Sequence, residues 1–257
     1  MRKVFLKYQI IFSSRFNKLK IFLSRRHYKS HIAMFHDIKE DGEILQSEYD
    51  CYISNLVDYL KFCALNGIKI VSIDTLLDDV QRENIENAAV ITFDDGYESV
   101  YTLVSEKMKE FNVPFTIYVN TELLGQKGYL SEIQLKELSA MKLCTIGMHA
   151  HEHIMFRYTS NQFLKEDFEK CKAKLTEILG FSPKHYAFPY GSVYAVSKKN
   201  IKCVKKMGVS TIALTKQCML SRRNIKHPFA LPRLDIPGYY NGRVNRRFKG
   251  IGVGNID

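Results

Sequence analysis

The sequence predicts one α/β domain in which a parallel sheet closes, or nearly closes, into a barrel surrounded by helices. Short apolar segments alternate with longer segments of helical periodicity, and about seven such units follow one another in a single run. Alternation of this kind implies parallel strands connected by helices. A barrel fits one run of consecutive units better than two domains do, and an open sheet is the alternative.

The apolar segments have the length of buried strands. They are His31–His36, Ile68–Ser72, Ala88–Phe93, Phe115–Val119, Cys144–Met148, His185–Phe188 and Ser210–Leu214. Polar clusters directly follow several of these runs. In parallel α/β folds the functional side chains lie at the carboxyl ends of strands, so these clusters are the first candidates for a site.

Five segments between the strands carry apolar residues at helical spacing. They are Glu48–Asn66, Ser99–Phe111, Glu132–Met141, Asn161–Leu179 and Ser197–Met207. Ser131 precedes the third as a predicted N-cap. Gly67, Gly180 and Gly208 each follow a helix at the position where glycine commonly ends one.

Charge is the unusual feature of an otherwise ordinary globular composition. Of the 257 residues, 46% are hydrophobic and 25% are charged, and the formal net charge is +11. Residues 1–31 carry nine basic residues and no Asp or Glu. We therefore predict a basic N-terminal arm at 1–30, a folded domain at 31–240 and a small basic tail at 241–257.

The basic arm interleaves Lys and Arg with short apolar islands. This pattern suits an interfacial helix on an anionic membrane, or a solvated and partly disordered arm. No apolar run reaches the ~18–20 residues needed to cross a bilayer, and the N-terminus is a poor signal peptide. A nucleic-acid partner is not expected, because no docking motif accompanies the charge.

The six cysteines are scattered without a CxxC pair. We expect reduced thiols in a cytoplasmic protein, with peripheral attachment to the inner face of the membrane through the arm as an added expectation. An exported protein with one or two disulfides is the alternative.

The most informative segment is the apolar run Ala88–Phe93 followed by Asp94, Asp95 and Gly96. Adjacent side chains on a strand point in opposite directions, so two neighbouring carboxylates can divide their work only where the strand breaks. One of them can then bind a metal while the other takes a proton from water. An ordinary Asp-Asp-Gly turn is the alternative.

A group of histidines, His149, His151 and His153, follows the predicted strand Cys144–Met148. Two imidazoles and one carboxylate around a divalent ion leave coordination sites open for water and substrate, as hydrolytic zinc sites require. We favour His149 and His153 as the ligand pair, with His151 pointing away, over a histidine-rich surface loop.

Two weaker signals also lie at strand ends. In Phe188-Pro189-Tyr190-Gly191, proline and glycine indicate a rigid turn whose backbone N–H groups suit an oxyanion. His36 closes the first predicted strand, and a lone histidine there is either a core residue or a functional one.

Together these motifs resemble the first three motifs of the polysaccharide deacetylases, the family 4 carbohydrate esterases with the NodB-homology domain. They are Thr92-Phe93-Asp94-Asp95-Gly96, His149-x-x-x-His153 and Phe188-Pro189-Tyr190-Gly191, and both order and spacing match. The likeness runs from about residue 31 to residue 236. It implies that the domain at 31–240 is a single catalytic domain with a distorted seven-stranded β/α barrel.

The resemblance also implies a metal site and a reaction. Asp95, His149 and His153 would bind a divalent metal, Zn²⁺ first, with Co²⁺, Ni²⁺ or Mn²⁺ as alternatives. The reaction would be hydrolytic removal of an acetyl group from an N-acetylated sugar in a polysaccharide or a lipid-linked glycan.

The remaining roles follow from the same resemblance. Asp94 would be the general base, and the backbone N–H of Tyr190 would help to hold the oxyanion. Phe35-His36 and Leu231-Pro232-Arg233-Leu234 resemble segments of the branch that deacetylates poly-N-acetylglucosamine. On that likeness His36 would protonate the departing amine and Arg233 would orient the Asp94 carboxylate.

Three positions depart from the usual family pattern. Ala150 stands where Ser or Thr usually follows the first metal histidine, Ala187 stands where many members have Arg, and the late Leu-x-His motif is absent. Arg233 is the expected substitute for the missing arginine. Aromatic residues that could stack on sugar rings include Tyr97, Tyr129 and Tyr194.

Two functions of other classes stay open on the sequence. One is a metal-dependent amidohydrolase that acts on a small non-sugar amide, because related barrels use similar ligands. The other is a non-catalytic carbohydrate-binding relative that has kept the fold.

Overall fold

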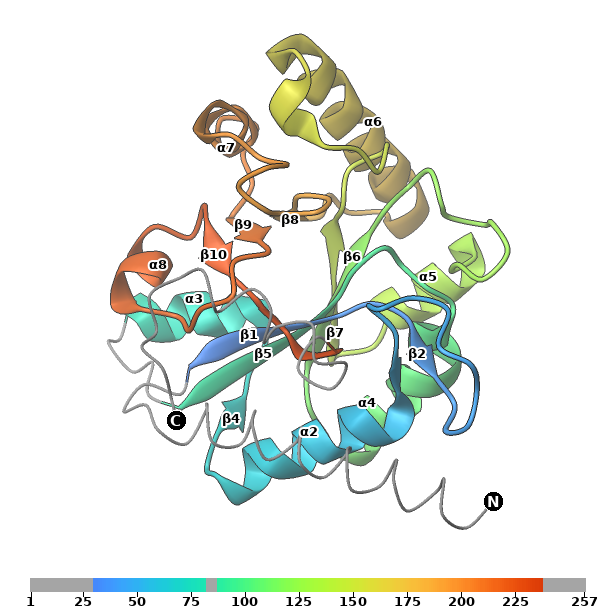
Figure 1. Ribbon diagram of the computed structural model, residues 1–257. Helices are drawn as coiled ribbons and strands as arrows, with labels where there is room; N and C mark the ends of the chain where they lie inside the picture. Colours follow the sequence, from blue (N-terminus) through green and yellow to red (C-terminus); the bar gives the residue numbers. More distant parts are fainter. Residues whose placement is uncertain (1–29, 82–86, 238–257) are drawn as a thin grey trace.

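A computed structural model describes residues 30–81 and 87–237, and it shows a ring of mainly parallel strands with helices around the outside (Figure 1). The predicted basic arm, apart from Ser30, and the predicted tail at 241–257 lie outside the described residues. Within the described residues, no helix combines the length and the apolar character that crossing a bilayer requires.

Nine strands of the described residues form the main sheet, in the order β10-β9-β8-β7-β6-β5-β1-β11 with β4 beside β5. They are β1 His31–Phe35, β4 Lys69–Ile70, β5 Ala88–Phe93, β6 Phe115–Val119, β7 Cys144–Met148, β8 His185–Ala187, β9 Thr211–Leu214, β10 Leu231–Pro232 and β11 Leu234–Asp235. Two short strands, β2 Ile38–Lys39 and β3 Cys51–Tyr52, pair with each other outside that sheet.

The helices lie outside the strands and connect them (Figure 1). They are α2 Ile53–Leu65, α3 Ile73–Gln81, α4 Ser105–Glu110, α5 Glu132–Ser139, α6 Asn161–Leu179, α7 Lys198–Lys205 and α8 Arg222–Lys226. A π-helix, Val100–Val104, precedes α4, and a 3₁₀ turn, Phe156–Tyr158, precedes α6. The predicted N-cap is confirmed, because the Ser131 side chain accepts the Gln134 N–H, and Gly180 ends α6 in the left-handed conformation.

The ring of strands closes at Arg233. β10 pairs with β9 at one end of the sheet and β11 pairs with β1 at the other, and only Arg233 separates β10 from β11. The chain therefore steps from one edge of the sheet to the other at a single, fully buried residue. The predicted single-domain barrel is confirmed, and the open-sheet alternative is not.

One predicted strand is shorter than expected, and one strand of the ring was not predicted. The segment predicted as Ile68–Ser72 forms only the two-residue β4, which pairs with the first residues of β5, and β6 takes over the same edge of β5 from Thr92 onward. The interrupted segment 231–235 instead completes the ring. It was not predicted as a strand because each half is two residues long and one half contains a proline.

Two of the predicted helices begin later than expected. The helix predicted from Glu48 begins at Ile53, because Cys51 and Tyr52 pair with β2. The segment predicted as one helix over 99–111 begins with a π turn before it becomes α4. α3 and α8 were not predicted at all.

Inside the ring, Tyr118 clusters with Ala187 and Ala213. Gly147 on β7 leaves room for this ring, since a Cβ there would lie 2.6 Å from a Tyr118 ring carbon. The Arg233 guanidinium carbon lies 5.3 Å from the centroid of the same ring. The barrel interior is thus packed up to the level at which the site begins.

All six cysteines are free thiols, and four of them are buried. Burial raises the pKa of the Cys63 and Cys171 thiols to about 12. These two thiols are therefore core residues rather than nucleophiles, in line with the prediction of reduced cysteines.

Candidate metal centre and active site

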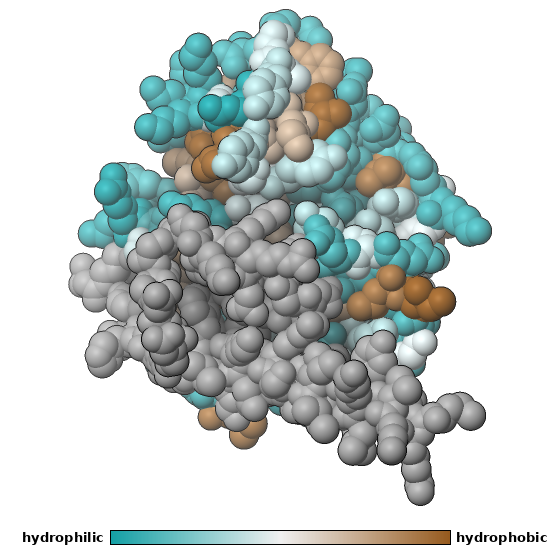
Figure 2. Space-filling view, in the orientation of Figure 1, coloured by the Kyte–Doolittle hydropathy of each residue, from teal (hydrophilic) through white to brown (hydrophobic). Residues whose placement is uncertain are grey.

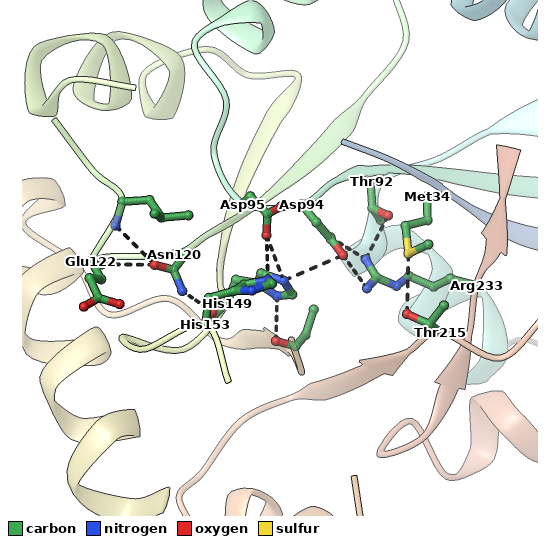
Figure 3. Close-up of polar contacts among 12 residues, drawn as sticks. Met34, Thr92, Asp94, Asp95, Asn120, Glu122, His149, His153, Thr215 and Arg233 are labelled. Atoms are coloured by element: carbon green, nitrogen blue, oxygen red, sulfur yellow. Dashed lines mark hydrogen bonds and ion pairs between the residues drawn. The ribbon is translucent and has the colours of Figure 1, made fainter. Parts of the chain in front are cut away.

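Three side chains from two strand ends converge on one point. The Oδ1 atom of Asp95 lies 3.3 Å from the Nε2 atom of His149 and 3.1 Å from that of His153. The potential ligand atoms of the three residues all lie within 4.8 Å of one another. Figure 3 shows Asp95 facing both imidazoles. The three predicted metal ligands are therefore brought together.

The strand breaks between the two aspartates, and this break separates their side chains. Asp94 continues the sheet, because its N–H donates to the Phe35 carbonyl at 3.0 Å. Asp95 has a φ of 71° and Gly96 a φ of 83°, both in the left-handed region that Asp tolerates and Gly favours. Asp94 then points towards Arg233 while Asp95 points towards the histidines (Figure 3).

A hydrogen bond at one ring nitrogen of His149 determines which nitrogen is turned towards Asp95. Its Nδ1 lies 2.8 Å from the carbonyl oxygen of Ala187, which can only accept, so Nδ1 donates to it and the lone pair of the neutral ring lies on Nε2. Asp95 Oδ1 is buried and has no hydrogen-bond partner among the described residues. Asp95 Oδ1 and His149 Nε2 thus face each other across 3.3 Å, an arrangement that a cation between them stabilises.

The donor set fits a divalent metal. Two imidazole nitrogens and one carboxylate oxygen are the ligands of hydrolytic zinc sites, and they leave further positions open. The Asp95 carboxylate is ionised at neutral pH, as a metal ligand must be. Burial alone would raise the pKa of Asp95, but the contacts with His149 and His153 lower it well below its ordinary value.

His151 is not part of this cluster. Its Nδ1 lies 3.0 Å from the Thr121 hydroxyl, on the other side of the loop. The Asp167 carboxylate accepts the backbone N–H groups of His151 and Glu152 at 3.0 and 2.7 Å. Asp167 comes from α6 and is buried beside Phe168.

Asp167 explains how the metal loop is held without the usual hydroxyl residue. Ala150 cannot brace the loop through its side chain, and it has a φ of 63°. The two hydrogen bonds from the loop to Asp167 fix the backbone just after that position. Asp167 was not predicted as a site residue, although a carboxylate at a buried position of an amphipathic helix was a usable signal.

Asn120 is a second supporting residue that was missed. It follows β6 directly, donates its amide to the His149 carbonyl at 3.2 Å and accepts the N–H groups of Glu122 and Leu123. It therefore ties the end of β6 to the end of β7 (Figure 3). Its position immediately after a predicted strand was the signal available in the sequence.

A bidentate ion pair holds Asp94. Arg233 Nη1 and Nη2 donate to Oδ1 and Oδ2 of Asp94 at 2.6 and 2.7 Å, and Nη1 also reaches the Thr92 hydroxyl at 3.3 Å. Burial would raise the pKa of Asp94, but the Arg233 guanidinium, with smaller effects from His149 and His36, lowers that pKa below its ordinary value. Asp94 Oδ2 lies 3.9 Å from His149 Nε2, so this carboxylate borders the metal cluster.

The turn at Tyr190 lies next to His153. Tyr190 has a φ of 59°, and its ring centroid is 4.8 Å from that of His153. Gly191 cannot be replaced easily, because a Cβ there would lie 2.4 Å from the Thr215 backbone nitrogen. The Tyr190 N–H donates to no group within the described residues, so it is available to a ligand.

His36 follows β1 at the same rim, one residue after the Phe35–Phe93 pair of the sheet. Its ring centroid lies 5.0 Å from that of Tyr49, and its buried Nδ1 has no hydrogen-bond partner among the described residues. Among the described residues, no hydrogen bond joins His36 to Asp94. His36 is thus a neighbour of the cluster rather than part of it.

The three tyrosines considered for sugar stacking differ in their surroundings. The rings of Tyr97 and Tyr129 stack on each other, with centroids 4.8 Å apart and planes 24° apart. Tyr194, in contrast, is 75% exposed. Only Tyr194 of the three therefore has a ring that is largely open to a ligand.

Comparison with known proteins agrees with this geometry. The profile of the family described as "Polysaccharide deacetylase" matches residues 81–212. YxkH of Bacillus subtilis strain 168, which has a provisional polysaccharide deacetylase assignment, is 22% identical over 188 residues, covering 70% of this chain and 63% of YxkH. The poly-beta-1,6-N-acetyl-D-glucosamine N-deacetylase of Staphylococcus aureus is 25% identical over 132 residues, covering 46% of this chain and 44% of that enzyme.

A solved structure shows the same fold. IcaB from Ammonifex degensii superposes with a TM-score of 0.69 and 20% identity, covering 83% of this chain and 98% of that one. The chain spans between about two fifths and two thirds of the length of the two sequence relatives.

The first prediction concerns the metal cluster. His149→Ala should lose Zn²⁺ on dialysis, because one of three protein ligands is removed, whereas His151→Ala should retain it. Metal content measured by mass spectrometry on the two purified variants provides the check. Equal Zn²⁺ content in both variants would contradict the assignment of His149 as a ligand.

The second prediction concerns the buried ion pair. Arg233→Met should lower the free energy of unfolding by about 3–5 kcal/mol, because it leaves the Asp94 charge buried and unpaired. The double variant Arg233→Met, Asp94→Asn should lose less, since no uncompensated charge remains. Urea unfolding measures both, with the exposed Arg223→Met as a control that should cost no more than about 0.5 kcal/mol. A cost for Arg233→Met as small as that of the control would refute this account.

Proposed function

This chain belongs to the polysaccharide deacetylase family, and we propose that it removes acetyl groups from an N-acetylated sugar polymer by metal-assisted hydrolysis. The observation that carries the proposal is the convergence of Asp95, His149 and His153 beside a second, separately held carboxylate. A protein that only binds glycans has no need for a buried carboxylate fixed next to a metal site.

Asp95 and the two histidines would hold the metal, and we propose Zn²⁺ as the ion. A divalent ion would supply Lewis acidity there, polarising the acetyl carbonyl and lowering the pKa of a bound water to about 7. The Ala187 carbonyl keeps His149 in the tautomer that presents Nε2, and Asp167 and Asn120 keep the loop and the strand end in place.

Asp94 is the proposed general base. Arg233 engages both carboxylate oxygens but leaves each with a second lone pair, so a proton can still be accepted at Oδ2, the oxygen nearer His149. Because its pKa is lowered, Asp94 is ionised at neutral pH and ready to take a proton from the attacking water.

Two further groups complete the proposed reaction. The Tyr190 N–H, which has no partner within the described residues, donates to the oxygen that becomes negative when the carbonyl is attacked. His36, whose buried Nδ1 has no partner in the same part of the chain, delivers a proton to the departing amine. An amine leaves poorly until it is protonated, so acetate and a free amino sugar result.

The substrate class rests on the relatives. A poly-beta-1,6-N-acetyl-D-glucosamine N-deacetylase matches part of this chain, which supports an N-acetylated glucosamine polymer as the kind of substrate. The exposed ring of Tyr190, next to His153, and the exposed ring of Tyr194 on the same loop offer apolar faces on which a sugar ring can pack.

The third prediction is the direct test of this function. The purified full chain should release acetate from chitohexaose, lose that activity in the presence of a chelator and regain it when Zn²⁺ is added. Acetate is measured by a coupled assay, with small cyclic amides as competing substrates. Hydrolysis of a cyclic amide without acetate release from chitohexaose would identify an amidohydrolase instead.

The fourth prediction separates the base from the ligands. Asp94→Asn should keep its Zn²⁺ and lose about 10²–10⁴-fold in kcat, because the amide cannot accept the proton. The matched control is Asp78→Asn on the exposed face of α3, which should be as active as the unmodified protein. A zinc-loaded Asp94→Asn protein with normal turnover would remove the base assignment.

A further inference from the structure

Charge is divided unevenly within the folded barrel itself. Residues 178–234 contain eleven Lys and Arg and no Asp or Glu, whereas residues 30–177 contain fourteen basic and twenty-five acidic residues. Figure 2 shows a hydrophilic surface over α7, which belongs to the basic part. Separating charges in this way increases self-repulsion within the basic part, so an external anion would relieve it.

The centre of the basic part is the outer face of α7, which we call the lysine face. It consists of Lys198, Lys199, Lys202, Lys205 and Lys206, all of them exposed. The opposite side of the helix is buried through Asn200, Cys203 and Val204. The five lysines therefore all project from the side of the helix that the barrel does not use.

The lysine face has no acidic partner within the described residues. Lysines elsewhere do pair, as Lys107 does with Glu110 at 2.8 Å. On α7, the Lys205 amino group instead lies over the Phe229 ring, 4.4 Å from its centroid.

The order of the lysines along α7 also costs stability. Lys198 and Lys199 lie in the first turn, where the helix dipole disfavours cations and where no acidic residue compensates. Lys202 is spaced three or four residues from each of the other four, so like charges lie next to one another on the helix. A bound anion would offset both the unfavourable helix dipole and the repulsion between neighbouring lysines.

The lysine face starts at the rim that holds the metal cluster. α7 follows the Tyr190 turn, so its first turn lies towards the carboxyl end of β8. Two hydrogen bonds attach α7 and the residues before it to the segment that follows His153. Asn200 donates to the Phe156 carbonyl at 3.2 Å, and the Arg157 N–H donates to the Ala195 carbonyl at 2.8 Å. A polymer that enters the site past Tyr190 can therefore continue along α7.

We propose, on the basis of the function proposed above, that the lysine face binds an anionic stretch of the same glycan whose acetyl group enters the metal site. Each deacetylation leaves an amine, so a polymer of N-acetyl sugars alone gains positive charge and is increasingly repelled by α7. A glycan that also carries carboxylate or phosphate groups is attracted instead. The substrate class is thus an anionic N-acetylated glycan.

The test compares two labelled hexasaccharides by fluorescence anisotropy with the full chain. Hyaluronan hexasaccharide alternates N-acetylglucosamine with a carboxylate sugar, and chitohexaose contains N-acetylglucosamine alone. At low ionic strength, hyaluronan should bind about tenfold more tightly, and added salt should remove the difference. Equal affinity for the two hexasaccharides would overturn the proposal.

A matched pair of variants assigns the preference to α7. The triple variant Lys198→Gln, Lys199→Gln, Lys202→Gln should lose most of the preference. The control Lys142→Gln, Lys165→Gln, Lys170→Gln removes the same charge from exposed lysines elsewhere and should keep it. Because both variants retain the basic residues 1–29, any contribution of those residues is the same in both. Equal loss in the two variants would show that net charge alone is responsible.

Two parallel measurements distinguish the other outcomes. If the α7 variant loses binding to phosphatidylglycerol vesicles but keeps its preference for hyaluronan, the lysine face serves a membrane surface and the glycan proposal is wrong. Acetate release from chitohexaose by the unmodified protein reports on the proposed function alone. A protein that releases no acetate but prefers hyaluronan through α7 would lose the proposed function while keeping the anionic-glycan face.

Discussion

The site depends first on the buried ion pair between Arg233 and Asp94. Arg233 is the single residue between the two halves of the strand that closes the ring, and its guanidinium takes both oxygens of Asp94 at the end of β5. Neither charge could remain buried without the other. Closure of the barrel and orientation of the proposed base are therefore one interaction, which explains how a fully buried arginine is kept at the closing point.

The break in β5 gives the two adjacent aspartates different surroundings. A continuous strand would send one carboxylate into the ring and the other towards the helices. The left-handed backbone of Asp95 and Gly96 instead turns Asp95 towards His149 and His153, while Asp94 stays in the sheet beside Phe35. One carboxylate is paired with a permanent cation and the other faces two imidazoles, so neighbouring residues of the same type can serve as base and as ligand.

Most of the atoms that hold the cluster in place belong to the backbone or to residues from other elements. The Ala187 carbonyl sets the tautomer of His149, Asp167 from α6 fixes the metal loop, and Asn120 joins two strand ends. These contacts compensate for the departures at Ala150 and Ala187. Ala150 has no side-chain hydroxyl, but Asp167 holds its loop. Ala187 stands where an arginine is usual, but its carbonyl accepts a hydrogen bond from His149, and Arg233 contacts Asp94 from between β10 and β11.

The sequence by itself determined the barrel, most of its strands and the three residues of the candidate metal site, because the strand-end motifs are local patterns and parallel strands bring their carboxyl ends to one rim. It did not determine that 231–235 would close the ring, since two paired residues on each side of Arg233 give no periodic signal. Nor did it determine what Asp167 and the Ala187 carbonyl contact, because a hydrogen bond between distant segments leaves no local pattern. Only the tertiary structure decided these points: they depend on which elements pack side by side.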